Sequence, residues 1–214
     1  MKLIVIGAHQ RRDDVEPLAI ALPAGPLFLS AVEIAADQPL GDRDLLLRVA
    51  KIRGQLLDRA TFVAIRYGFT AGNAIEAAVK CAAQIERWMR LLDEHREHVE
   101  MTLKVAATSA QPRPDRRGFT SGAEYLKALH AATHGVTIDD AFRAAVESRI
   151  TPLTVEHRWI PRDEKSVEYV ALIERSRIDD MRAAGEALKR ECPHVAFLLS
   201  GPWPLEVFAD ADRE

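Results

Sequence analysis

Histidine pairs and adjacent carboxylates are the groups in this 214-residue chain whose spacing could support metal or acid–base chemistry. His130 and His134 stand four residues apart in a segment with helical spacing, so both imidazoles could reach one ion. Residue 131 is alanine, however, where the H-E-x-x-H motif has its glutamate base, and the spacing supplies no third ligand. A metal-dependent hydrolase is therefore the last of three hypotheses for this chain.

The remaining candidate motifs are explained by helix starts. Asp139-Asp140 and Asp179-Asp180 each fall in a predicted first helical turn, where negative charge favours the helix dipole. GFTAG at 68–72 and GFTSG at 118–122 also precede helices, but both lack the lysine of a phosphate-binding loop. We therefore predict no catalytic residues, no cofactor and no metal, which means that the chain is not expected to be an enzyme.

Composition narrows the classes of partner. The formal charge of -3 leaves no basic field to attract a phosphate backbone, so nucleic acid is not expected as a partner. The most apolar window, 18–36, is interrupted by prolines and Glu33, and no membrane-spanning segment is predicted. Cys81 and Cys192 lie in unrelated contexts, which favours reduced thiols over a disulfide framework. Oligomeric state is not fixed by any of these features.

Residues 1–93 are predicted to form an N-terminal α/β domain. Apolar, partly β-branched runs predict strands at 3–6, 27–34 and 61–66. Apolar spacing of three or four predicts a helix over 43–59, with Asp42 at its N-cap. A second helix is predicted over 73–92, with a buried stripe made of Ile75, Val79, Ala82, Ile85, Met89 and Leu92.

Residues 94–214 show the order β-α-β-β-α-β. Alternating apolar residues predict strands at 99–105, 153–159 and 167–173, the last two forming a hairpin, and 195–199 is a fourth strand. Ser121 and Thr137 are predicted to open two helical segments after the first strand, and a further helix spans 177–191. This order is typical of a ferredoxin-like fold. The chain as a whole is thus predicted to be a two-domain α+β protein.

The segment SGPWPLEVF at 200–208 is not explained by these elements. Pro202 and Pro204 fix φ on either side of Trp203 and hold its ring in one pose. Two interpretations stay open, because such a ring could lock the tail onto the core or anchor a partner.

This segment resembles the TGPWPPYSF ending of the gas vesicle GvpL/GvpF family. Upstream, AIRYGFTAGNAIEAAV at 64–79 resembles a strand and helix of that family, with Arg66, Tyr67 and Gly68 matching its Arg-Phe-Gly core. Glu100 to Val105 and SGAEYL at 121–126 resemble two further segments, in the same order. The chain thus resembles a divergent, short member of the family.

The resemblance implies a second domain with a modified ferredoxin-like fold and an accessory or minor structural role in gas vesicle assembly. The implied partners are the major gas vesicle shell protein and other gas vesicle accessory proteins, in the cytoplasm and associated with gas vesicles. The candidate protein-contact residues are Arg66, Tyr67, Gly68, Gly201, Pro202, Trp203, Pro204 and Phe208. The alternative hypothesis is a ferredoxin-like module that binds a small ligand or regulates without catalysis, since this fold hosts many functions.

Overall fold

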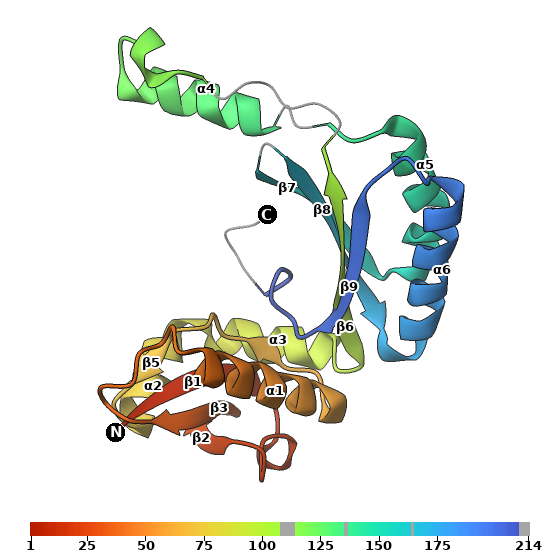
Figure 1. Ribbon diagram of the computed structural model, residues 1–214. Coiled ribbons are helices and arrows are strands. Elements are labelled where there is room, and N and C mark those ends of the chain that lie inside the picture. Colours follow the sequence, from red (N-terminus) through yellow and green to blue (C-terminus); the bar gives the residue numbers. More distant parts are fainter. Residues whose placement is uncertain (108–113, 135–136, 164, 210–214) are drawn as a thin grey trace. The chain divides into compact units, whose positions relative to one another are not determined.

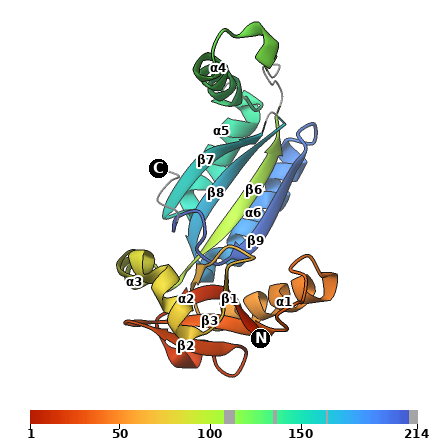
Figure 2. The ribbon, with the colours of Figure 1, turned by 90° about the vertical axis from the view of Figure 1, so that its left-hand side faces the viewer.

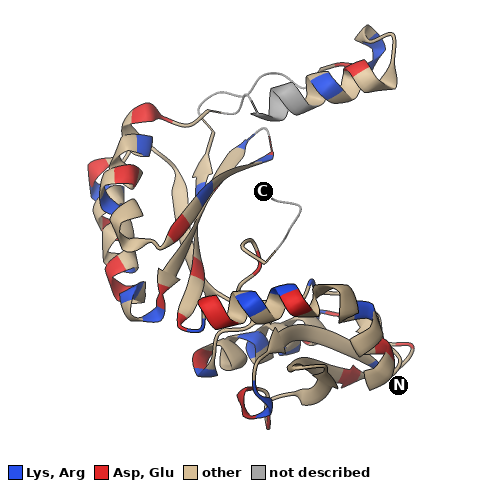
Figure 3. Cartoon of the chain, turned by 180° about the vertical axis from the view of Figure 1, so that it is seen from behind, with Lys and Arg blue, Asp and Glu red and all other residues tan. Residues whose placement is uncertain are grey.

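The computed structural model describes residues 1–107, 114–134, 137–163 and 165–209, with residues 130–134 described by their backbone alone. The chain is a mixed α+β protein with two antiparallel sheets, and it divides into two compact units (Figure 1). Unit 1 comprises Met1–Val99 and Trp203–Glu214, and unit 2 comprises Glu100–Pro202. Acidic and basic residues are interspersed along the helices of both units (Figure 3).

The named strands of the sheet of unit 1 pair in antiparallel fashion. Its strands are β2 (Ile20–Ala24), β3 (Leu27–Ile34), β1 (Lys2–His9) and β4 (Val63–Ala64) in that order, and β5 (Thr70–Ala71) also pairs with β1. The sequence analysis predicts an α/β domain here and misses β2. The missed strand forms a tight hairpin with β3, and a two-residue connection of this kind joins antiparallel strands. Unit 1 is therefore α+β in type.

Helix α1 (Arg43–Arg59) has the predicted bounds and the predicted cap, because the Asp42 side chain accepts a hydrogen bond from the Leu45 backbone N–H at 2.8 Å. The helix predicted over 73–92 is instead two helices, α2 (Ala74–Cys81) and α3 (Ile85–Glu94), separated by a 3₁₀ turn. Its predicted buried stripe is wrong over the whole of α2, where Ile75 and Val79 are exposed and Ala77 and Cys81 are buried instead. Ala82 is exposed as well, whereas Leu92 is buried as predicted.

Unit 2 contains α4 (Gly122–His134), α5 (Asp140–Arg149), β7 (Glu156–Asp163), β8 (Ser166–Glu174) and α6 (Ile178–Glu191). It also contains β6 (His98–Ala106) from Glu100 onward and β9 (Phe197–Trp203) as far as Pro202. The sheet order is β7-β8-β6-β9, and α5 and α6 cover one face of it (Figure 2). The predicted hairpin is present, with Trp159 opposite Tyr169. The N-cap of α5 is Asp139 rather than Thr137, because its carboxylate accepts a hydrogen bond from the Phe142 N–H at 2.8 Å.

Short 3₁₀ turns lie at Arg12–Asp14, Ala82–Gln84, Arg116–Gly118, Thr151–Leu153 and Arg175–Arg177.

Within the described residues, no helix has both the length and the apolar character needed to cross a bilayer.

The boundary between the units differs from the predicted division at residue 93. The first part of unit 1 continues to Val99, and the tail expected in the second domain belongs to unit 1 from Trp203 onward. The reason is backbone pairing, since Leu205 forms a parallel bridge with Val63 of β4.

Candidate functional site

The tail after β9 adds itself to the sheet of unit 1 beside β4. The Leu205 N–H donates to the Phe62 carbonyl at 3.0 Å, and the Leu205 carbonyl accepts from the Ala64 N–H at 2.8 Å. The Leu205 side chain is fully buried, and Phe208 is only 4% exposed. The tail therefore covers part of a strand that would otherwise present unpaired backbone groups.

The turn at Arg66, Tyr67 and Gly68 directly follows this same strand. The Tyr67 hydroxyl donates to the Leu40 carbonyl at 2.7 Å, which ties the turn to the segment before α1. Gly68 has a φ of +93°, a conformation that favours glycine. Arg66 is exposed. Two motifs that lie far apart in the sequence thus meet on β4 within unit 1.

Gly201 holds the strand β9 close to β6. Its φ is +122°, and a Cβ atom added to it would lie 2.7 Å from the Met101 Sδ and 3.0 Å from the Glu100 carbonyl oxygen. Only glycine fits this combination of conformation and space without displacement of β6.

Arg53 of α1 hydrogen-bonds to the backbone next to the turn at 66–68. No motif in the sequence singles this residue out. Its Nη2 donates to the carbonyls of Ile65 and Ile6. Burial lowers the pKa of the Arg53 guanidinium, and the negative charge of Glu206 in the tail opposes this shift. The signal in the sequence is its position, because residue 53 lies four residues after Val49 and three before Leu56 on the buried face of α1.

A buried histidine lies at the end of β1, the strand that pairs with β4. His9 is fully buried, its ring stacks on Phe62 with centroids 4.7 Å apart, and its Nε2 lies 3.0 Å from the Ser30 Oγ. Burial lowers the pKa of His9 to about 4, with a smaller opposing effect from the charge of Asp14. His9 is therefore neutral near pH 7 and acts as a packed core residue.

Metal-binding residue types do not cluster in the part of the chain that the structure describes, since no three His, Cys, Asp or Glu side chains there could share an ion. The side chains of His130 and His134 lie outside the described residues, so the pair proposed from the sequence keeps its status as a hypothesis.

Comparison with known proteins gives the family. The sequence model of the family described as gas vesicle synthesis protein GvpL/GvpF matches residues 20–209. The chain belongs to the GvpL/GvpF family. No curated protein matches the chain by sequence. Membership of this family supports a role in gas vesicle assembly.

Two solved structures of GvpF share the fold of this GvpL/GvpF protein. The one from Anabaena sp. PCC7120 has a TM-score of 0.69 at 13% identity, covering 98% of this chain and 96% of that one. The one from Microcystis aeruginosa has a TM-score of 0.70 at 10% identity, covering 98% of this chain and 99% of that one. At these identities the likeness concerns the fold alone.

The eight contact residues predicted for this GvpL/GvpF protein differ in accessibility. Arg66 is exposed, and Trp203 is 48% exposed. The half-buried residues are Tyr67, Gly68, Gly201 and Pro202, and the buried ones are Pro204 and Phe208. Pro204 and Phe208 are thus buried parts of the tail, while Arg66 and Trp203 are exposed.

A further exposed feature is an apolar face on α2. Ile75 and Val79 are 78% and 69% exposed and, apart from Met1, have the largest exposed fractions among the large apolar side chains described. They lie one turn apart on the same side of the helix. The opposite side of α2 packs against β2. From the sequence both residues are expected in the core, because hydropathy cannot tell a buried alanine or cysteine face from an exposed β-branched one.

Proposed function

We propose that this GvpL/GvpF-family protein promotes gas vesicle assembly by binding the major shell subunit through unit 1, and that it does so without catalysis. The observation that carries the proposal is the exposed face formed by Ile75 and Val79. Removing these side chains from water on binding would contribute about 1.5–3 kcal/mol each. Association also costs translational and rotational freedom, so this face needs further contacts beside it.

The chemistry of the partner matches this face. A gas vesicle wall has to present an apolar surface to the gas, so its subunit exposes apolar area before it is assembled. Exposed apolar area of this kind drives aggregation unless another protein covers it. A chain that offers a small apolar helix face shields the subunit and can release it into the growing wall.

Arg66 and Trp203 are the proposed secondary contacts in unit 1. A half-exposed indole supplies large contact area at low entropic cost, and an exposed guanidinium can donate to carbonyl or carboxylate groups. Both residue types are enriched among those that dominate binding energy at protein interfaces.

Unit 2 is proposed to be a modified ferredoxin-like fold. Its strands and helices follow the chain in the order β6, α4, α5, β7, β8, α6, β9, which is β-α-β-β-α-β with the first helical segment divided. The packing of α5 and α6 on one sheet face supports this assignment (Figure 2). We place the protein in the cytoplasm with the forming gas vesicle, where other accessory proteins are its further partners.

Co-expression with the major shell protein tests the proposal. The measurement is the amount of shell protein left in the supernatant after centrifugation, with and without the full chain. We expect the wild-type chain to raise this amount and the Ile75→Glu, Val79→Glu double variant to lose most of the effect. Leu47→Glu is the matched control, because Leu47 is also an apolar helix residue and is 59% exposed.

The proposal is wrong if the wild-type chain leaves the solubility of the shell protein unchanged. It is also wrong in its choice of surface if the double variant and Leu47→Glu behave alike while both keep the wild-type circular dichroism spectrum. Arg66→Ala and Trp203→Ala, measured separately, report whether the secondary contacts add to the effect.

A further inference from the structure

The middle of α1 combines exposed basic and apolar side chains with no acidic residue among them. Residues 45–57 read LLLRVAKIRGQLL, and no aspartate or glutamate lies between Asp44 and Asp58. Arg48 and Lys51 are exposed, and Leu47 is 59% exposed. This stretch therefore gives unit 1 a positively charged surface that includes an apolar side chain.

The surface lies on the side of α1 that faces away from the core. The buried residues of the helix are Leu45, Val49, Leu56 and Leu57. Leu47, Lys51 and Gly54 follow one another at spacings of four and three, so they share the outward side. A Cβ atom added to Gly54 would have no atom within 4 Å. The outward side is thus open along two turns of the helix.

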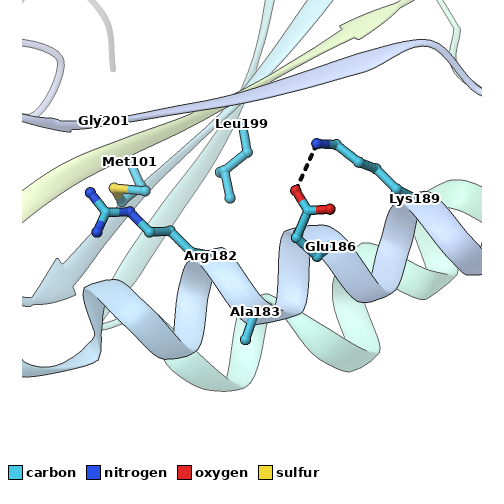
Figure 4. A pocket seen from close by; sticks show the side chains of 8 residues that line it. Met101, Arg182, Ala183, Glu186, Lys189, Leu199 and Gly201 are labelled. Atoms are coloured by element: carbon cyan, nitrogen blue, oxygen red, sulfur yellow. Dashed lines mark hydrogen bonds and ion pairs between the residues drawn. The ribbon is translucent and has the colours of Figure 1, made fainter.

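The basic side chains of this surface are not neutralised by their neighbours. Within the described residues, neither Arg48 nor Lys51 forms an ion pair, although Asp44 lies one turn before Arg48. On α6, by contrast, Lys189 pairs with Glu186 at 2.7 Å (Figure 4). The positive charge of α1 therefore favours an acidic partner, whereas a paired charge such as that of Lys189 has no such preference.

The form of the surface favours a helix as the occupant. Strand addition needs a row of unpaired backbone groups, which the side of a helix does not present. A membrane surface is disfavoured, because an interfacial helix inserts its wide apolar face into the bilayer and that face of α1 is already buried. Two copies of this surface would set like charges against each other, which disfavours self-association.

We infer that the outward side of α1 binds an amphipathic helix of a partner protein whose apolar stripe is flanked by glutamate or aspartate residues. The stripe packs on Leu47 and comes close to α1 at Gly54, where no side chain stands between the helices. The flanking carboxylates lie beside Arg48 and Lys51. Charge complementarity of this kind governs the choice of partner and the rate of association more than the affinity. The inference concerns α1, so it does not rest on the shell contact proposed for α2.

Fluorescence anisotropy with two labelled helical peptides tests this inference on the full-length protein. One peptide consists of three Glu-Leu-Ala-Ala-Leu-Glu-Ala repeats, and in the other every glutamate is replaced by lysine. At low salt we expect the acidic peptide to bind about tenfold more tightly than the basic one. The difference should shrink as the salt concentration rises, because salt screens exposed charges.

Variants locate the binding surface. The Arg48→Glu, Lys51→Glu double variant should reverse the preference between the peptides. The matched control is Arg90→Glu, Arg190→Glu, which changes the net charge by the same amount at exposed positions of other helices and should keep the preference. Leu47→Glu should weaken binding of the acidic peptide at least about tenfold, while its effect on the solubility of the shell protein stays that of the wild type. Circular dichroism checks that each variant is folded.

Three results would overturn the inference: no binding of the acidic peptide, equal binding of the two peptides, or the same change in both double variants. Two further measurements cover the other occupants. Binding to phosphatidylglycerol vesicles that needs Arg48 and Lys51, without binding of the acidic peptide, would assign the surface to a membrane. A dimer in sedimentation velocity that Leu47→Glu abolishes would assign it to a second copy of the chain. Either outcome contradicts an acidic helix, and each readout is separate from the solubility of the shell protein.

Discussion

Gly201 shows how a single residue fixes the end of β9. Its positive φ and its approach to the Met101 Sδ and the Glu100 carbonyl leave no space for a side chain. The residue lies within the segment by which the sequence resembles its family. Its role in the fold is to let β9 pass close to β6 before the tail crosses to unit 1.

We expect Gly201→Ala to lower the free energy of unfolding by about 2–4 kcal/mol, through backbone strain and overpacking against β6. Gly54→Ala is the control, because Gly54 lies in α1 with no atom within 4 Å of the added Cβ, and alanine there should stabilise by about 0.5–1 kcal/mol. Urea unfolding followed by tryptophan fluorescence measures both. Equal effects of the two substitutions would contradict the role given to Gly201.

His9 makes the stability of unit 1 depend on pH. Its pKa is about 4 in the folded protein and near 6.5 when the chain is unfolded, so the unfolded state binds the proton more readily. Its contribution to stability is therefore complete above pH 6.5 and is lost as the pH falls toward 4. The loss amounts to roughly 3 kcal/mol in total.

His9→Gln should remove this part of the pH dependence. We predict that the wild-type free energy of unfolding falls more steeply between pH 6.5 and 4.5 than that of His9→Gln. Parallel curves for wild type and His9→Gln, from urea denaturation at several pH values, would show that His9 is not the group responsible.

At the scale of elements, the pairing of the tail with β4 brings part of the segment at 200–208 to the strand that precedes the turn at 66–68. Leu205 supplies both a donor and an acceptor to neighbouring residues of that strand region, and its side chain is fully buried. The tail is thus an integral part of the sheet of unit 1.

Leu205→Ala should lower the free energy of unfolding by about 2–5 kcal/mol, as is usual for a buried leucine. Leu198→Ala offers a control in the same C-terminal stretch, where an exposed leucine should change stability by less than about 0.5 kcal/mol. Thermal or urea unfolding of the two variants measures this difference in the free energy of unfolding. A Leu205→Ala protein as stable as Leu198→Ala would mean that the tail does not hold unit 1 together.

Elements with strong local signals could be predicted from the sequence. Helix α1 has both a cap at Asp42 and a regular apolar stripe, and its predicted and observed bounds agree. Strand β2 could not be predicted, because its Pro23 and two alanines carry little strand propensity and an edge position tolerates proline. The side of α2 that faces the core was misassigned, since the choice between Ala77 and Ile75 depends on packing against β2.

The candidate site was predictable in its parts but not in its arrangement. The turn at 66–68 and the segment at 200–208 stand out in the sequence by their residue types. That both meet at β4 depends on long-range pairing, which no local pattern encodes. The burial of Phe208 and the exposure of Trp203 are likewise not encoded in a local pattern.

At the scale of the whole molecule, the proposed contact surface is the exposed apolar face that Ile75 and Val79 form on α2 of unit 1. The family supports a role in gas vesicle assembly, and the central claim is that the shell subunit docks on the α2 face of unit 1.

Site-specific photo-crosslinking tests this claim most directly. The photoreactive amino acid p-benzoylphenylalanine is placed at position 79 in α2, or at position 190 in α6 as the control, and each protein is irradiated with the major shell protein. We expect an adduct of one chain with one shell subunit from position 79, and none from position 190. Equal crosslinking from both positions, or an adduct only from position 190, would contradict it.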